Sequence, residues 1–223
     1  GRKIDPESQK EWNDQKQHIV DKRDKLQTKI NKLNTEAIKK GWNAEKLAKK
    51  IGNKQERVSG LNTVISNLAV LEESAQTYSL NSGATNNKLS YDATTGNIVI
   101  SYSGTALFAH EATHAGQFEI GDIAFASNGS SLAQDVYDEV ASYKAQWAYN
   151  PSSVGGLSST NQITASWVQG IKDPTSGDQP YKPGGSANTG ISSVNVNSTR
   201  DKLIRAYPHQ ESTLRQYPAN STL

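Results

Sequence analysis

The segment from His110 to His114 spells the pattern H-E-x-x-H. If this segment is helical, the two histidines lie four residues apart on one face and can bind a single zinc ion. Glu111 stands beside them, where it could take a proton from a water molecule that the metal activates. The pattern occurs by chance in roughly one of a hundred chains of this length, so the surrounding residues must decide its meaning.

A catalytic zinc site needs a third protein ligand and an open position for water. The chain contains no cysteine, which excludes a thiolate ligand. A third histidine in the pattern H-E-x-x-H-x-x-G-x-x-H is also excluded, because the glycine falls one position early, at Gly116, and Ile120 occupies the place of the histidine. The third ligand must therefore be a carboxylate or a more distant histidine.

Glu139 is the leading candidate for the third ligand. It lies 25 residues after His114 on the next expected helix, which is the layout of the gluzincins, where a glutamate of the following helix joins two histidines. Asp122 and His209 are the alternatives, although Asp122 follows the expected end of the histidine helix. We expect Asp135 and Asp138 as hydrogen-bond partners for the imidazole rings.

A metal-assisted acyl transfer also needs a hydrogen-bond donor for the oxyanion that develops in the transition state. Tyr143 lies on the same face of its helix as Glu139, whereas Tyr207 and His209 belong to a late segment. The sequence leaves these three candidates open. Glu139, Ser142, Tyr143 and Gln146 form a polar stripe at positions i, i+3, i+4 and i+7, for which solvent and a metal site are the competing explanations.

Two short strands precede the histidine helix. The alternation of apolar residues predicts strands over 89–92 and 97–102, joined by a turn over 93–96. An edge strand beside the metal could hold an extended peptide by strand addition. Ser103 or Thr105 is expected to cap the helix, which should end by Gly121. The helix that carries Glu139 is expected to run from Leu132 to the Asn150-Pro151 stop.

The first 80 residues are polar and helical in pattern. Apolar residues at helical spacing predict one helix over about 8–40 and a second from Asn43 to about Tyr78, interrupted near Gly52-Asn53. Residues 81–88 have the composition of a loop. We therefore expect a mainly helical α+β chain: an N-terminal helical hairpin over 1–80, and a zincin-like metallopeptidase domain over 81–223 whose C-terminal part is rich in loops.

Charge and hydropathy restrict the partners of the chain. Residues 1–80 carry 16 Lys and Arg against 11 Asp and Glu, and the remaining residues carry 8 against 11, which together give the net charge of +2. The two signs alternate closely in the basic half, which is typical of solvated helices and makes nucleic acid an unfavoured partner. No apolar run approaches the roughly 20 residues of a membrane span, so we expect a soluble protein.

Three segments carry a resemblance to a known family: HEATHAGQFE, DEVASYKAQWAY and GWNAEKLAKKIGNKQERVS. Together they resemble the C-terminal toxin regions of bacterial polymorphic toxins of the RHS-repeat type, which carry a predicted zinc metallopeptidase domain. The resemblance spans most of the chain. It implies a secreted effector delivered into a target cell, an upstream toxin polypeptide from which this piece derives, and a cognate immunity protein. The roles carried over are those of His110, Glu111, His114 and Glu139.

These observations leave three hypotheses about function. The leading one is a zinc metallopeptidase that cleaves a protein or peptide substrate, with Glu111 as general base. The second retains the zinc but hydrolyses a different bond, as an amidase or deamidase, or uses the metal for stability alone. The third is an interaction module in which the helical hairpin binds a partner and the H-E-x-x-H pattern is accidental.

Overall fold

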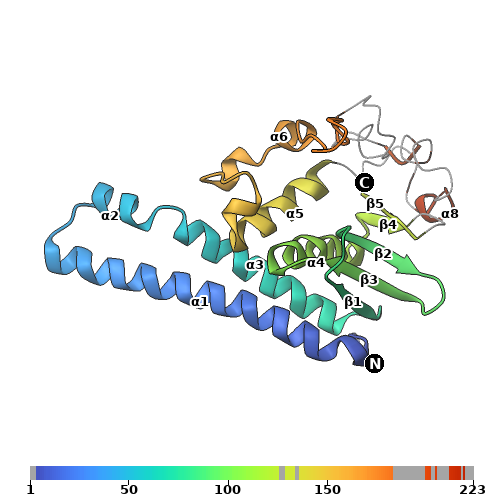
Figure 1. Ribbon diagram of the computed structural model, residues 1–223, viewed down its shortest axis with the longest axis horizontal. Coiled ribbons are helices and arrows are strands. Elements are labelled where there is room, and N and C mark those ends of the chain that lie inside the picture. The colour runs from blue at the N-terminus through green and yellow to red at the C-terminus, as the bar shows by residue number, and fades with distance from the viewer. Residues whose placement is uncertain are drawn as a thin grey trace.

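The computed structural model of the chain is a mainly helical α+β fold (Figure 1). It describes residues 4–125, 129–133, 136–182, 199–201, 204, 211–216 and 218. Among these residues, no helix is both long enough and apolar enough to cross a lipid bilayer.

The N-terminal hairpin consists of α1 (Gln9–Lys40), which follows a short 3-10 turn at Pro6–Ser8, and of α2 (Ala44–Ile51) and α3 (Lys54–Glu73). Helix α1 ends where Gly41 adopts a left-handed backbone with φ of 63°. The Asn43 side chain then accepts a hydrogen bond of 2.8 Å from the Lys46 backbone N–H and so caps α2. The predicted hairpin and the predicted break near Gly52 are confirmed.

The second helix of the hairpin is shorter than the sequence predicts. It ends at Glu73 instead of Tyr78, and Tyr78 begins strand β1 (Tyr78–Ser82). The ring of Tyr78 is fully buried, and the residue pairs with Ile98 in a parallel ladder. Part of the expected loop over 81–88 therefore belongs to a strand, because pairing with a neighbouring strand satisfies the polar backbone of this segment.

The sheet is formed by β1, β3 (Asn97–Tyr102) and β2 (Lys88–Asp92), in that order, with β3 at the centre. Strands β2 and β3 form the predicted antiparallel hairpin, and Leu89 pairs with Ile100. The outer edge of β2 is partly covered: the Tyr91 N–H donates to the Gly129 carbonyl at 2.8 Å, and Ser90 bridges Ser130. A peptide could not add to β2 along this covered stretch.

Helix α4 (Thr105–Glu119) carries the H-E-x-x-H pattern, as predicted. Its N-cap residue is Gly104, and no side chain caps it, so the expected caps Ser103 and Thr105 are wrong. The Thr105 hydroxyl instead donates to Gln15 Oε1 at 2.7 Å, and this bond attaches the start of α4 to α1.

The segment between α4 and the next helix contains two further strands, β4 (Ile123–Phe125) and β5 (Ser131–Ala133), which pair antiparallel. Because Leu132 of β5 pairs with Ala124 of β4, the next helix cannot begin at Leu132 as expected. It is α5 (Val136–Tyr149), and it stops before Pro151 as predicted. The later segments hold 3-10 turns at Pro151–Ser153 and Thr160–Gln162, and the short helices α6 (Ala165–Gln169) and α8 (Glu211–Leu214).

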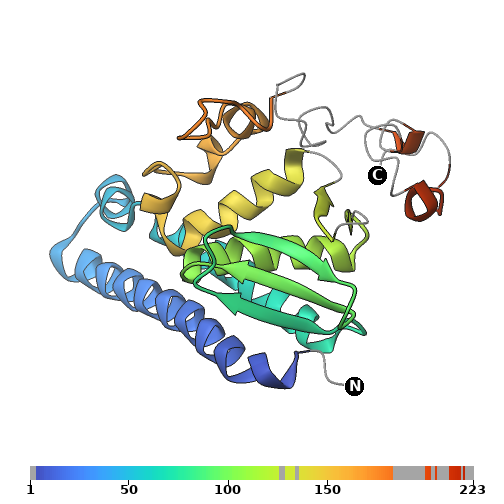
Figure 2. The ribbon, with the colours of Figure 1, turned by 45° about the vertical axis from the view of Figure 1, so that its right-hand side comes forward.

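Helix α3 connects the hairpin to the rest of the fold, since it packs on α1 and also on α4 and α5 (Figure 2). A Cβ atom added to Gly116 of α4 would lie 1.9 Å from the Asn67 side chain of α3, so glycine permits this close approach. Arg57 of α3 donates to the carbonyls of Ala148 and Tyr149 at 3.0 and 2.8 Å, at the C-terminal end of α5. The two segments that meet at the expected boundary near residue 80 therefore share one hydrophobic core.

Candidate metal centre

Helices α4 and α5 bring three potential metal ligands together. Nε2 of His110 lies 3.4 Å from Oε2 of Glu139, and Nε2 of His114 lies 3.3 Å from Oε1 of the same carboxylate. One ligand atom from each residue can be chosen so that all lie within 4.8 Å of one another. These three side chains could hold a metal ion.

The surroundings of this group fit a cation. Both histidines are buried, and Oε2 of Glu139 is a buried oxygen without a hydrogen-bond donor among the described residues. Leaving a buried carboxylate oxygen without a donor is energetically unfavourable, and a bound cation would supply the missing interaction. Two imidazole nitrogens and one carboxylate oxygen are also a donor set that catalytic zinc uses.

A glutamine orients the His110 ring. The Gln146 Nε2 group donates to the Ser153 carbonyl at 3.2 Å, which fixes the orientation of the amide. Oε1 of Gln146 therefore faces Nδ1 of His110, at 2.9 Å, and accepts its N–H. This tautomer leaves Nε2 of His110 directed at Glu139 and available to a metal ion.

His114 has an equivalent support from its own helix. Its Nδ1 lies 2.7 Å from Oε1 of Gln117, and the Gln117 Nε2 group donates to the Asp138 backbone carbonyl at 2.9 Å. The Ser142 hydroxyl lies 3.2 Å from the same Nδ1. Among the described residues, glutamines therefore face the Nδ1 atoms of both rings, and Asp138 takes part through its backbone carbonyl. The other expected aspartate, Asp135, lies outside the described residues.

The electrostatics follow from the same contacts. Burial by itself favours the neutral carboxyl of Glu139, but the neighbouring His114 and His110 imidazoles hold its pKa well below the ordinary value. Burial would likewise lower the pKa of His114, yet the carboxylates of Glu139 and Glu111 and the hydrogen bond to Gln117 raise it to about 10. In the metal-free protein, the protonated His114 ring thus balances the negative charge of the Glu139 carboxylate, which a bound cation would otherwise balance.

Comparisons with known proteins do not identify the chain. No protein-family model, no curated protein and no solved structure matches it. The chemistry of the site must therefore be inferred from its own geometry.

A cavity of about 410 Å³ opens beside the ligand group. Glu111 and His110 line it together with apolar side chains from several segments, namely Leu107, Val154, Trp167 and Ile171. The carboxylate of Glu111 accepts no hydrogen bond from the described residues, and burial raises its pKa against the opposing charges of His110 and His114. Glu111 is therefore a carboxylate with raised proton affinity at the wall of a cavity that a substrate could enter.

Two tyrosines, Tyr143 and Tyr181, line the same cavity as Glu111. The Tyr143 ring stands edge to face against the His110 ring, with centroids 4.7 Å apart, and its hydroxyl is hydrogen-bonded to that of Tyr181. Burial, followed by the nearby carboxylate of Glu139, raises the pKa of both hydroxyls, so both stay protonated at neutral pH and can donate. Tyr143 thus lies where the sequence places it, and Tyr181 adds a second hydroxyl.

The other sequence candidates do not join this site. Asp122 is described but does not belong to the group of possible ligands around the two histidines. Tyr207 and His209 lie outside the described residues. All four members of the polar stripe on α5 contact the histidines. Ser142 and Gln146 lie against Nδ1 atoms and Glu139 against the Nε2 atoms, and the ring of Tyr143 lies against that of His110.

Two polar residues of the site, Gln117 and Tyr181, were not identified from the sequence. Gln117 follows His114 by three residues, a spacing that places two side chains next to each other on a helix, and this spacing could have indicated it. Tyr181 lies in a segment rich in Gly, Ser and Pro, which we expect to be a substrate-cleft loop or a connector. No periodicity there distinguishes a tyrosine of the cavity from one that only anchors the loop.

Proposed function

We propose that the chain is a zinc-dependent metallopeptidase with a zincin-like core, in which His110, His114 and Glu139 hold the metal. The observation that carries the proposal is the position of Glu139, whose carboxylate meets both Nε2 atoms and keeps one buried oxygen without a donor. The H-E-x-x-H spacing, the glutamine supports and the cavity beside Glu111 give it further support.

The chemistry divides between the metal and the chain. When bound, zinc supplies Lewis acidity that lowers the pKa of water toward neutrality and polarises a carbonyl group. Glu111 serves as general base: it takes the proton of the attacking water, and its pKa, raised by burial, suits this role better than that of an exposed glutamate. The same carboxyl group then returns the proton to the leaving nitrogen.

Tyr143 and Tyr181 would stabilise the charge that develops on the carbonyl oxygen, since a protonated hydroxyl fixed in a buried site is an effective donor. The apolar side chains of Trp167 and Ile171 on the same cavity wall would hold the substrate chain against the metal. The family resemblance supports a delivered toxin with a cognate immunity protein as the setting of this activity.

The test is digestion of a mixed peptide library by the zinc-loaded chain, with new termini identified by mass spectrometry. The wild type should cleave peptide bonds, and Glu111→Gln should lower the rate by about 10²- to 10⁴-fold while it keeps about one zinc per chain. Glu73→Gln, an exposed substitution on α3, is the matched control and should cleave at the wild-type rate. Unchanged cleavage by Glu111→Gln would overturn the mechanism, and loss of side-chain amides without backbone cleavage would favour the deamidase.

A further inference from the structure

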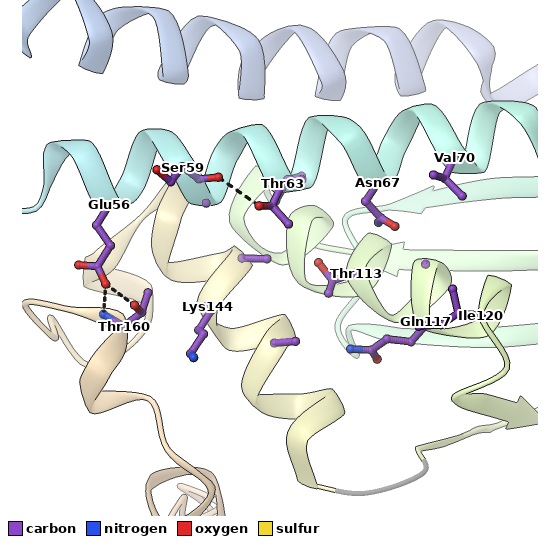
Figure 3. Close-up of a pocket in the computed structure, with 15 residues that line it drawn as sticks. Glu56, Ser59, Thr63, Asn67, Val70, Thr113, Gln117, Ile120, Lys144 and Thr160 are labelled. Carbon is purple, nitrogen blue, oxygen red and sulfur yellow. Dashed lines mark hydrogen bonds between the residues drawn. The ribbon is translucent and has the colours of Figure 1, made fainter. Parts of the chain in front are cut away.

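A second cavity, of about 580 Å³, forms a groove between α3, α4 and α5 (Figure 3). The groove follows one face of α3 from Glu56 to Val70, and its other wall is built by Thr113, Ile120 and Ala141. None of the residues that line it lines the cavity beside Glu111. It is therefore a separate site on another face of α4, and its volume lies within the range of small-molecule pockets.

Most polar side chains of this groove are already satisfied within the protein. The hydroxyls of Thr63 and Thr113 each donate to the helix carbonyl four residues earlier, at 3.2 and 2.8 Å. Nδ2 of Asn67 donates to the Ala112 carbonyl at 2.8 Å. These bonds direct the two threonine hydroxyls and Nδ2 of Asn67 toward helix backbone carbonyls.

The acidic and amide side chains that line the groove, Glu56 and Gln117, also have hydrogen-bond partners within the protein. Oε1 of Glu56 accepts hydrogen bonds from the Thr160 backbone N–H, at 2.9 Å, and from the Thr160 hydroxyl (Figure 3). Gln117 uses both ends of its amide, on His114 and on the Asp138 carbonyl. An apolar group could enter the groove without breaking these hydrogen bonds, which removes the main cost of covering polar groups.

Apolar side chains at one end of the groove remain open to solvent. Ile120 is 73% exposed and Val70 is 51% exposed, and the figure places them at the same end (Figure 3). Exposed apolar side chains that border an apolar groove indicate a binding surface more strongly than the same residues scattered singly.

Lys144 supplies the one charge of the groove lining that lacks a partner among the described residues. It projects from α5 at the rim, it is exposed, and no described carboxylate pairs with it. Glu56, the acidic member of the lining, accepts hydrogen bonds from Thr160 and forms no ion pair with Lys144. The groove thus combines an apolar floor with a solvent-exposed positive charge that no described carboxylate pairs.

We propose that this groove binds an anionic amphiphile, with its hydrocarbon chain along α3 and its carboxylate at Lys144. The charge of the rim favours a single negative head group, and the satisfied polar lining favours an aliphatic body over a polar one. This proposal does not rest on the peptidase activity. Apart from Gln117, whose amide is held by His114 and the Asp138 carbonyl, the groove is lined by residues that take no part in the candidate metal centre.

The experiment measures binding of two probes of equal chain length, decanoate and decyltrimethylammonium, by titration calorimetry on the full chain below their micelle concentrations. Wild type should bind decanoate at one site and prefer it to the cationic probe. Lys144→Met should weaken decanoate binding about fivefold, and Lys144→Glu should reverse the preference. Ala141→Trp, which fills the groove from an exposed helix position, should lower decanoate affinity at least tenfold.

Ala69→Trp is the matched control, since Ala69 is exposed on α3 and does not line the groove. It should bind decanoate as wild type does, and the melting temperatures of all variants should confirm that they fold. Absence of saturable decanoate binding would overturn the proposal. The proposal would also be contradicted if the two probes bound with equal affinity, or if Ala141→Trp left the decanoate affinity unchanged. Either result would favour a protein partner as the occupant of the groove.

Discussion

Oε1 of Glu139 lies 3.3 Å from Nε2 of His114, although 25 residues and two short strands separate them in the chain. The contact exists because α4 and α5 pack against each other, and Gln117 of α4 also donates to the Asp138 backbone carbonyl of α5. Packing of the two helices, and not any local motif, therefore completes the candidate metal site.

Replacement of Glu139 should reduce zinc affinity more than replacement of Asp122 does. Glu139→Ala removes a ligand and should reduce zinc affinity by at least about 100-fold, because loss of a mere hydrogen-bond partner of a ligand already costs 10- to 100-fold. Asp122→Ala should keep the wild-type affinity. Competition with a chromogenic chelator measures both values, and the opposite order would assign the third ligand to Asp122.

The glutamines that accept hydrogen bonds from the two imidazole rings should increase zinc affinity. Gln146→Leu and Gln117→Leu each leave a ring nitrogen without its acceptor and should weaken zinc binding by about 10- to 100-fold. Gln55→Leu, at an exposed position of α3, is the control for the substitution itself. If both site variants bound zinc as tightly as this control, the proposed orientation of the rings would be wrong.

Zinc affinity should rise with pH. The carboxylate of Glu139 raises the pKa of His114 to about 10 in the metal-free protein, so this ring carries a proton at neutral pH. Zinc binds only the neutral imidazole, and binding must therefore release that proton. Between pH 6 and pH 8 the affinity should increase by about tenfold per pH unit. Calorimetry in buffers of different ionisation enthalpy measures the released protons, and a value of zero would contradict the described electrostatics.

Replacement of either Tyr143 or Tyr181 should lower kcat more than it changes KM. Tyr143→Phe or Tyr181→Phe removes one donor to the developing oxyanion and should lower kcat by up to about 10²- to 10³-fold, with a small change in KM. Tyr91→Phe, on strand β2 and outside the cavity, should have no effect. An unchanged kcat in both cavity variants would place the oxyanion donor elsewhere in the chain.

Local patterns predict a large part of this fold. The helical spacing of apolar residues predicts α1 as far as Lys40, and the alternation around Ile98 and Ile100 predicts β3. The H-E-x-x-H spacing predicts that His110 and His114 share one face of α4. The polar stripe on α5 that includes Glu139 also follows from local spacing, whereas its contact with the two histidines depends on the packing of α4 against α5. Each of the predicted features depends on residues within a few turns of one another.

Features that depend on distant parts of the chain were not predictable in the same way. Strand β1 is five residues long and largely polar, and only its parallel pairing with β3 reveals it. The start of α5 shifts to Val136 because Leu132 pairs with Ala124. Tyr181 enters the cavity through its contact with Tyr143, 38 residues earlier, and no local signal marks it.

Anomalous X-ray scattering at the zinc absorption edge, on crystals of the chain grown with zinc, locates the metal without reference to activity. We expect one peak bound by Nε2 of His110, Nε2 of His114 and a carboxylate oxygen of Glu139, with the Glu111 carboxylate nearby but not coordinated. A peak held by other residues, or crystals without a peak between α4 and α5, would contradict the proposed zinc site.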